Sequence, residues 1–457
     1  MCKILIIIIV LINSLAFASP KKISLKEAIK IALKNNLEYK ISLKEQGIAD
    51  EKVNAVWGKL MPVLESEISM IRQYAENGFL SLSDGQYDIK VIQLTFGINP
   101  GMFYNSLKMS KKAYKAAALN VRRIKSEIIY NVIKSYFSVL LADELISLRE
   151  DAISLLKENL KDVNNLYKTG TVPKYELLQA QVKLKSQEPL LFEARNKYSL
   201  SLDLYNYYLG NDTTKYGVNI DILKKTKFRK PRDKTLTAIK RLSPIAMRNR
   251  PEIIQLTLKK EIAGHLKNIN SSFYIWPTFT IGGYYGVTKL LPNTPNVNAP
   301  VDIDLSGITG NSNWQNTFQV RLAATYRWSA LLPVDSSRAN ERQEKINIKK
   351  TELELNRLKR LISISLKSNY SKLMTSYYTI NSQRENVDRA QEGLRIARVS
   401  YNAGVIKNSE LLASQLSLTE AKTGYINAIN NYYQSLASLQ KEIGIDNENI
   451  IFGGKDE

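Results

Sequence analysis

The chain has 457 residues and a formal net charge of +22, and it contains one cysteine, Cys2, and one histidine, His265. These counts exclude disulfide bonds, metal sites built on thiolates or on several histidines, and most histidine-based catalysis. We therefore predict a protein without a metal ion or other cofactor.

The N-terminal residues have the three parts of a secretory signal. A short basic start precedes an unbroken apolar run over 4–12, and Ala16 and Ala18 are small residues of the kind that a signal peptidase accepts. The apolar run is too short to anchor a chain permanently in a bilayer. We predict a cleaved signal peptide over 1–18, so the chain is exported and Cys2 is lost.

The positive charge raises the alternative of a nucleic-acid-binding protein. Its densest basic run covers 224–232, and clustered lysine and arginine bind phosphate. Most other basic residues alternate with glutamate along helical faces, which is typical of a solvated surface. Because export also separates the chain from nucleic acid, we predict no nucleic-acid partner. A retained cytoplasmic N-terminus would revive this alternative.

The chain repeats one plan twice. Segments 166–178 and 400–412 align with a tyrosine, a glycine, a glutamate and a pair of leucines in register. Earlier in each half, 32–38 aligns with 246–252. Such internal similarity predicts two copies of one structural unit. The predicted organisation is a first repeat over 19–212, a basic linker over 213–242, a second repeat over 243–444 and a tail over 445–457.

Each half is predicted to contain an amphipathic helix, two strands, a long helix and a returning helix. In the first half these are expected at 25–59, 64–74, 87–96, 106–167 and 174–209. In the second half they are expected at 244–271, 279–287, 318–328, 336–401 and 409–443, with a longer loop around 290–316. Alternation of apolar and polar side chains indicates the strands. Each long helix lacks proline and ends at a glycine, Gly170 or Gly404, which tolerates the left-handed conformation that closes a helix.

Four strands per chain predict an oligomeric channel. Strands of about ten residues with one apolar face suit the wall of a membrane barrel, but four cannot close one, and an open edge in lipid leaves backbone groups unpaired. Two chains would supply eight strands and three would supply twelve, a better width for a duct. The fold class is therefore mixed but mainly α: a long α-helical barrel continuous with a trimeric twelve-stranded transmembrane β-barrel.

Three sequence features resemble the TolC-like outer-membrane efflux family over nearly the whole mature chain. They are the opening of the first helix at 24–28, the segment 248–252, and the two Tyr-x-x-Gly turns followed by Glu-Leu-Leu. The resemblance implies a homotrimer in lipid of the outer membrane, with a long periplasmic extension. It also implies docking to a periplasmic adaptor (membrane fusion) protein, which connects this exit duct to an inner-membrane transporter.

The resemblance also implies a gate at the periplasmic tip. The turns at Gly170 and Gly404 would form this tip, where the family closes its channel by coiling the helices inward. Tyr401 falls at the position of a gate tyrosine, and Glu176 falls at the position of its acidic partner from the neighbouring helices. Ordinary helix packing is an equally good explanation for the tyrosine.

Other gate positions of the family differ in this chain. Glu410 matches an aspartate that forms a ring at the narrowest point of the channel in the trimer. A gate arginine falls on Ile406, with Lys407 next to it, and a second acidic ring falls on Ala413. The resemblance therefore implies a weaker ionic latch or a different closure. A carboxylate in the first turn of a helix is also favoured by the helix dipole, by about 0.3–1 kcal/mol, which is an alternative explanation for Glu410 and Glu176. For Glu410 we favour the gate, because a trimer would bring three copies of it together.

No motif for catalysis is present: the sequence has no glycine-rich phosphate loop, no nucleophile elbow and no cluster with metal-ligand spacing. We therefore predict that the chain is not an enzyme and that partners supply the energy for transport. Two alternatives stay open. A type I secretion outlet would use the same fold to pass proteins, and a periplasmic coiled coil would have no pore.

Overall fold

The computed structural model describes residues 21–72, 83–211, 215–219, 228–231, 234–292, 313–444 and 451–452. The predicted signal peptide lies outside the described residues, as do most of the basic run over 224–232, the loop around 290–316 and the tail over 445–457. Among the described helices, none combines the length and apolar character needed to cross a bilayer.

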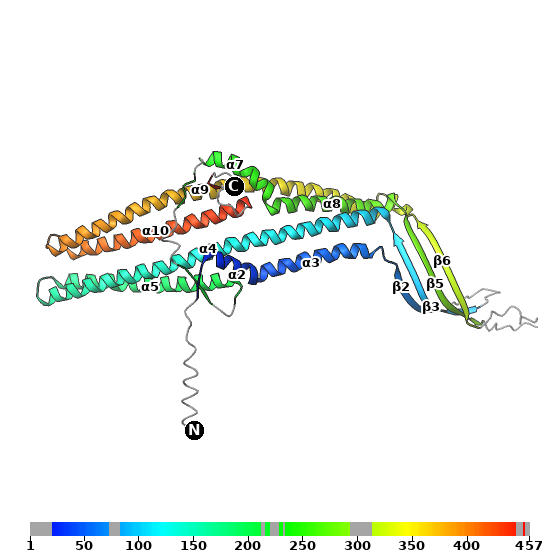
Figure 1. Ribbon diagram of the computed structural model, residues 1–457, viewed down its shortest axis with the longest axis horizontal. Coiled ribbons are helices and arrows are strands. Elements are labelled where there is room, and N and C mark those ends of the chain that lie inside the picture. The colour runs from blue at the N-terminus through cyan, green and yellow to red at the C-terminus, as the bar shows by residue number, and fades with distance from the viewer. Residues whose placement is uncertain are drawn as a thin grey trace, which may run out of the picture. The chain divides into compact units, whose positions relative to one another are not determined.

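The elements follow the same order twice (Figure 1). The helices are α2 (Leu25–Asn35), α3 (Leu37–Gly58), α4 (Pro100–Lys168), α5 (Lys174–Leu209), α7 (Thr235–Asn249), α8 (Pro251–Ile275), η1 (Trp328–Leu331), α9 (Ser336–Asn402) and α10 (Asn408–Ile443). The strands are β1 (Lys21–Ile23), β2 (Val63–Arg72), β3 (Ser83–Ile98), β4 (Tyr216–Val218), β5 (Thr278–Pro292) and β6 (Gln315–Thr325). The prediction of two long helices, two returning helices and four long strands is confirmed.

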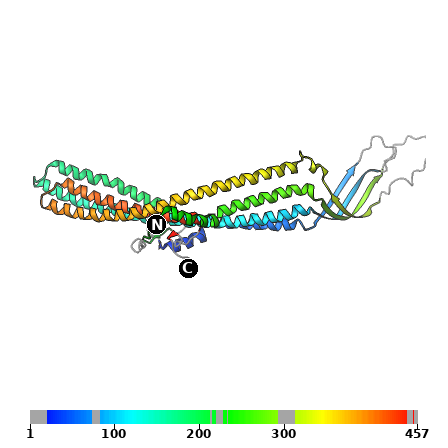
Figure 2. The same ribbon diagram turned by 90° about the horizontal axis from the view of Figure 1, so that it is seen from above.

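The chain divides into two compact units. A helical unit comprises Met1–Lys44, Ala118–Gln255 and Leu355–Glu457, and a sheet unit comprises Glu45–Ala117 and Leu256–Glu354. In the helical unit, α5 runs back along the end of α4, and α10 runs back along the end of α9 (Figures 1 and 2). These two helical hairpins, one from each half of the chain, form most of that unit.

The core of the helical unit repeats the plan of the sequence. Four apolar residues of α4 that are at most 1% exposed have equally buried counterparts on α9, each at the same interval in the sequence. The pairs are Ile128 and Ile362, Val132 and Leu366, Tyr136 and Tyr370, and Val139 and Leu373. Their spacing places each set on one face of its helix. Both halves therefore bury equivalent faces in one core.

In the sheet unit, four long strands form one sheet in the order β2-β3-β5-β6, and every neighbouring pair is antiparallel. The central pair, β3 and β5, joins the two halves of the chain. Shifts in register interrupt the ladders between Glu65 and Glu67 and between Lys90 and Ile92. Such bulges increase the local bend and twist of a sheet.

The prediction of a single helix over 25–59 is wrong in one respect. The helix breaks at Asn36 into α2 and α3. The Asn36 side chain donates to the carbonyl oxygen of Tyr208 at 3.0 Å and accepts from the backbone N–H of Tyr39 at 3.2 Å. The second bond caps the start of α3 and replaces a helical bond that the break removes, and the first connects the break to α5. The equivalent break between α7 and α8 lies at Arg250, where Pro251 disfavours helical geometry of the preceding residue.

The start of the second-half helix is also wrong. The prediction placed it at Pro244, but α7 begins at Thr235, inside the segment predicted as a basic linker. A proline inside a helix removes one backbone hydrogen bond. The buried face formed by Ala238, Leu242 and Ala246 continues across Pro244, and this burial outweighs the lost bond.

Candidate functional site

The two glycine turns have nearly identical geometry. Gly170 and Gly404 have φ values of 76° and 73°. At the second turn, the N–H of Gly404 donates to the carbonyl of Tyr401, and the N–H of Val405 donates to that of Ser400, both at 2.9 Å. This pair of bonds is the Schellman motif, which satisfies the last carbonyls of a helix. The first turn has the same two bonds, so the prediction that glycines end the long helices is confirmed.

The Tyr401 side chain lies in the last turn of α9, with its phenol oxygen buried and without a hydrogen-bond partner among the described residues. Burial raises the pKa of Tyr401, and the negative charges of Glu176 and Asp162 raise it further. Glu176 therefore lies close enough to Tyr401 to influence its pKa. It does not form the hydrogen bond that would join them into a closed latch.

The charged residues of the second turn are open to solvent. Lys407 is the N-cap of α10, without a capping side-chain bond, and Glu410 lies in the first turn of that helix. Both are exposed, and neither forms an ion pair within the described part of this single chain. Their charges are therefore available to a neighbouring molecule or to passing ions.

Asn408 is the first residue of α10, directly after the N-cap. It is 1% exposed, and its Oδ1 accepts a hydrogen bond of 2.5 Å from Nδ2 of Asn159 on α4. The other amide atoms, Oδ1 of Asn159 and Nδ2 of Asn408, are buried without partners in the described structure. A polar bond inside the core thus joins the two hairpins.

Sequence reasoning missed this amide pair, although one signal was present. Asn159 lies on the same face of α4 as Leu156 and Val163, which are both buried. A polar residue at an apolar position of a helical pattern indicates a partner within the core. An apolar cluster of Ile153, Leu156, Leu184 and Leu412 surrounds this end of the hairpins.

The long sheet has two chemically different faces. Side chains on one face are apolar and exposed in the single chain: Leu64, Ile68, Met70, Ile92, Leu94, Ile281, Phe318, Val320 and Leu322. The opposite face carries Glu67 and Lys90, joined by an ion pair of 2.8 Å, and the polar side chains of Gln93, Gln319 and Arg321. This alternation is typical of a transmembrane β-barrel, with apolar side chains toward lipid and polar ones toward the lumen.

A comparison with protein families identifies the chain. The model of the outer membrane efflux protein family matches residues 28–204 and 279–444, which together make up most of the sequence. The chain belongs to the outer membrane efflux protein family. As an outer membrane efflux protein, it is a transport protein of the outer membrane and not an enzyme, as the sequence analysis predicted.

Solved structures of outer membrane channels share this fold. The CmeC channel of Campylobacter jejuni has 18% identity and a TM-score of 0.75, with 92% of this chain and 85% of CmeC covered. MtrE of Neisseria gonorrhoeae, in its open state, has 16% identity and a TM-score of 0.69, with coverage of 92% and 89%. VceC of Vibrio cholerae has 12% identity and a TM-score of 0.70, with coverage of 92% and 96%. A search of curated proteins finds no significant match.

Proposed function

We propose that three copies of this outer membrane efflux protein form a passive exit duct. It receives substrates from an inner-membrane pump through a periplasmic adaptor and releases them outside the cell. Each copy contributes two repeats, over 19–212 and 243–444, and four strands of the barrel wall. The observation that carries this proposal is the sheet, apolar on one face and polar on the other, whose four strands cannot close a barrel alone.

The two outer strands of the sheet support assembly from several chains. Each of β2 and β6 pairs with only one neighbouring strand within the described part of the chain. In hydrocarbon, such an edge leaves backbone N–H and C=O groups without partners, at a cost of several kcal/mol per group. Pairing of β6 with β2 of the next chain removes every open edge, and three copies supply twelve strands.

The surface of α5 supports the same assembly. Leu178, Val182, Phe192, Leu200 and Leu204 are all exposed in the single chain, and their spacing places them on one side of the helix. Five large apolar side chains exposed along one side of a helix are unfavourable in water and indicate a protein contact. We assign it to the neighbouring copy in the trimer.

Glu410 is proposed to form the constriction at the periplasmic tip, with Lys407, Tyr401 and Glu176 around it. In a trimer, three copies of its exposed carboxylate surround one axis, and rings of carboxylates favour cations. The turns at Gly170 and Gly404 position these residues. Because Tyr401 and Glu176 share no hydrogen bond in the single chain, the closed state depends on contacts between chains.

Single-channel recording tests the constriction. Purified trimers in planar bilayers are expected to give cation-selective currents, and Glu410→Ala is expected to lower the cation preference. An interaction of about 1 kcal/mol between an ion and a nearby carboxylate in water corresponds to roughly a fivefold effect. Glu420→Ala, which removes an exposed charge elsewhere on α10, is the matched control. Equal selectivity of wild type and Glu410→Ala would contradict the assignment of Glu410.

A further inference from the structure

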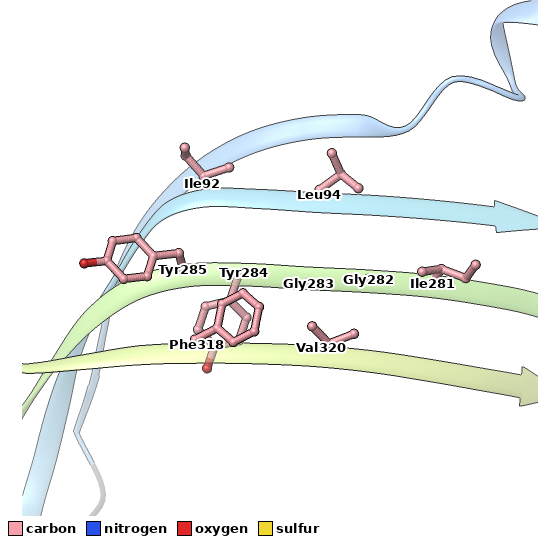
Figure 3. Close-up of a pocket in the computed structure, with 9 residues that line it drawn as sticks. All are labelled: Ile92, Leu94, Ile281, Gly282, Gly283, Tyr284, Tyr285, Phe318 and Val320. Atoms are coloured by element: carbon pink, nitrogen blue, oxygen red, sulfur yellow. The ribbon is translucent and has the colours of Figure 1, made fainter.

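The apolar face of the sheet contains a groove over β3, β5 and β6 (Figure 3). Its volume is about 350 Å³. One row of side chains across the three strands consists of Ile92, Tyr285 and Phe318, which are neighbours in the strand register. The groove lies next to this row, and its lining is almost entirely apolar.

Gly283 creates the groove. It pairs with Leu94 on β3 and with Val320 on β6, and side chains of paired residues lie on the same face of a sheet. Ile281 and Tyr285 precede and follow it on that face. Four large side chains therefore surround a position that has none, as Figure 3 shows.

Aromatic residues at both ends of the strands locate the groove within the membrane. Trp276 and Trp328 lie beside the strand ends that continue into the helices, and both are exposed. Trp314 lies at the other end, before β6, and is also exposed. Because tryptophan is enriched at both membrane interfaces, Gly283 lies at the depth of the hydrocarbon.

A basic residue lies on the same face at the end away from the helices. Lys289 pairs with Tyr87, and its Nζ lies 5.9 Å from the ring centre of Trp314. The rings of Tyr87 and Trp314 have centres 6.5 Å apart. An ammonium group among interfacial aromatic rings is suited to bind the phosphate of a lipid headgroup.

The distance between Lys289 and Gly283 matches the depth of one leaflet. At about 3.4 Å per residue the two positions are roughly 20 Å apart along β5. With a strand tilt of about 45° this corresponds to roughly 14 Å of depth, close to half of a hydrocarbon core of about 30 Å. An acyl chain that follows β5 from a phosphate at Lys289 therefore reaches the groove at Gly283 near the middle of the bilayer.

We propose that the groove binds one acyl chain of a phosphorylated lipid of the outer leaflet, with the phosphate at Lys289. The inference rests on the proposed function, because it takes this sheet as part of the barrel wall. The helices of an outer membrane efflux protein extend into the periplasm, so the opposite strand ends face the outer leaflet. The positive charge of Lys289 selects a phosphorylated lipid, and the apolar lining selects its hydrocarbon chain.

Native mass spectrometry of the full-length trimer with added lipid A tests this proposal. Wild type is expected to retain the lipid, up to one molecule per chain. Gly283→Val fills the groove and is expected to abolish retention, and Lys289→Gln is expected to weaken it about fivefold. Gly97→Ala is the matched control, because Gly97 does not line the groove and an added methyl group there meets its nearest atom at 3.8 Å.

A second variant tests the groove without a substitution at Gly283, in case Gly283→Val does not fold. A Cβ at Gly283 would lie 3.2 Å from the carbonyl oxygen of Gln319, so Gly283→Val can disturb the strand. Leu94→Phe covers the same gap from β3, as aromatic side chains do beside a strand glycine, and is expected to reduce retention as well.

Several outcomes would overturn the proposal. Equal retention by wild type, Gly283→Val and Leu94→Phe would exclude the groove as the site. Equal retention of uncharged diacylglycerol and lipid A would exclude the role of Lys289. A conducting wild-type trimer that retains no lipid would refute this inference and leave the proposed function intact, whereas a chain that forms no trimer would refute the proposed function itself.

Discussion

Asn408 shows how the role of a residue depends on its partner. At the start of a helix an asparagine usually caps the backbone, but this side chain is buried against Asn159. One hydrogen bond joins the two amides, and two amide atoms remain unpaired. A buried polar atom without a partner costs about 1–3 kcal/mol. The pair thus gives specificity to the contact between the hairpins and adds little stability.

Substitutions of Asn159 and Asn408 separate the contribution of their hydrogen bond from the cost of burying unpaired amide atoms. Asn408→Ala leaves the Asn159 amide buried alone and is expected to lower the free energy of unfolding by about 1–3 kcal/mol. Replacement of both residues by leucine is expected to be nearly neutral or stabilising, since both polar groups leave the core together. Thermal unfolding followed by circular dichroism measures both effects. Asn386→Ala, at an exposed position on α9, is the control.

Either of two results would refute this account of the amide pair. If Asn408→Ala were as stable as Asn386→Ala, the amide pair would not lie in a dry core. If the double leucine variant were much less stable than Asn408→Ala, the amides would contribute more than the apolar side chains that replace them.

At the scale of the elements, the helix ends at glycine and the break before Pro251 follow local chemistry, but the break at Asn36 does not. The ends at Gly170 and Gly404 are predictable, because few residues other than glycine adopt positive φ readily. Gly210 and Gly444 end α5 and α10 in the same conformation. The break at Asn36 depends instead on its bond to the Tyr208 carbonyl, which a helix far along the chain supplies. No local pattern contains that information.

Gly393 inside α9 and Gly404 in the turn after it give opposite predictions for the same substitution. Gly404→Ala is expected to destabilise the hairpin by about 1–2 kcal/mol, since φ is positive there and a Cβ strains that conformation. Gly393→Ala is expected to stabilise it by about 0.5–1 kcal/mol, since a helix interior favours alanine. Neither added Cβ meets an atom within 4 Å, so the backbone alone determines the sign. Thermal unfolding measures the stability of both variants. Melting temperatures that shift in the same direction would contradict the argument.

At the scale of the molecule, the sequence pattern predicts the repeat and the sheet better than the tip. Alternation along the strands depends on the two environments of a barrel wall, which every residue of a strand experiences. The tip depends on a few contacts between hairpins and between chains. Glu410 and Lys407 are exposed in the single chain, and the partners that the gate proposal requires belong to other copies. A sequence pattern within one chain does not specify those contacts.

The trimer is the central claim, because the barrel, the constriction and the lipid groove all depend on it. Native mass spectrometry of the complex extracted from membranes tests it most directly. Four strands per chain and a barrel wide enough for a duct predict one species with three chains. A monodisperse species with one, two or four chains would contradict the account, since the sheets would then close a barrel of different size or none.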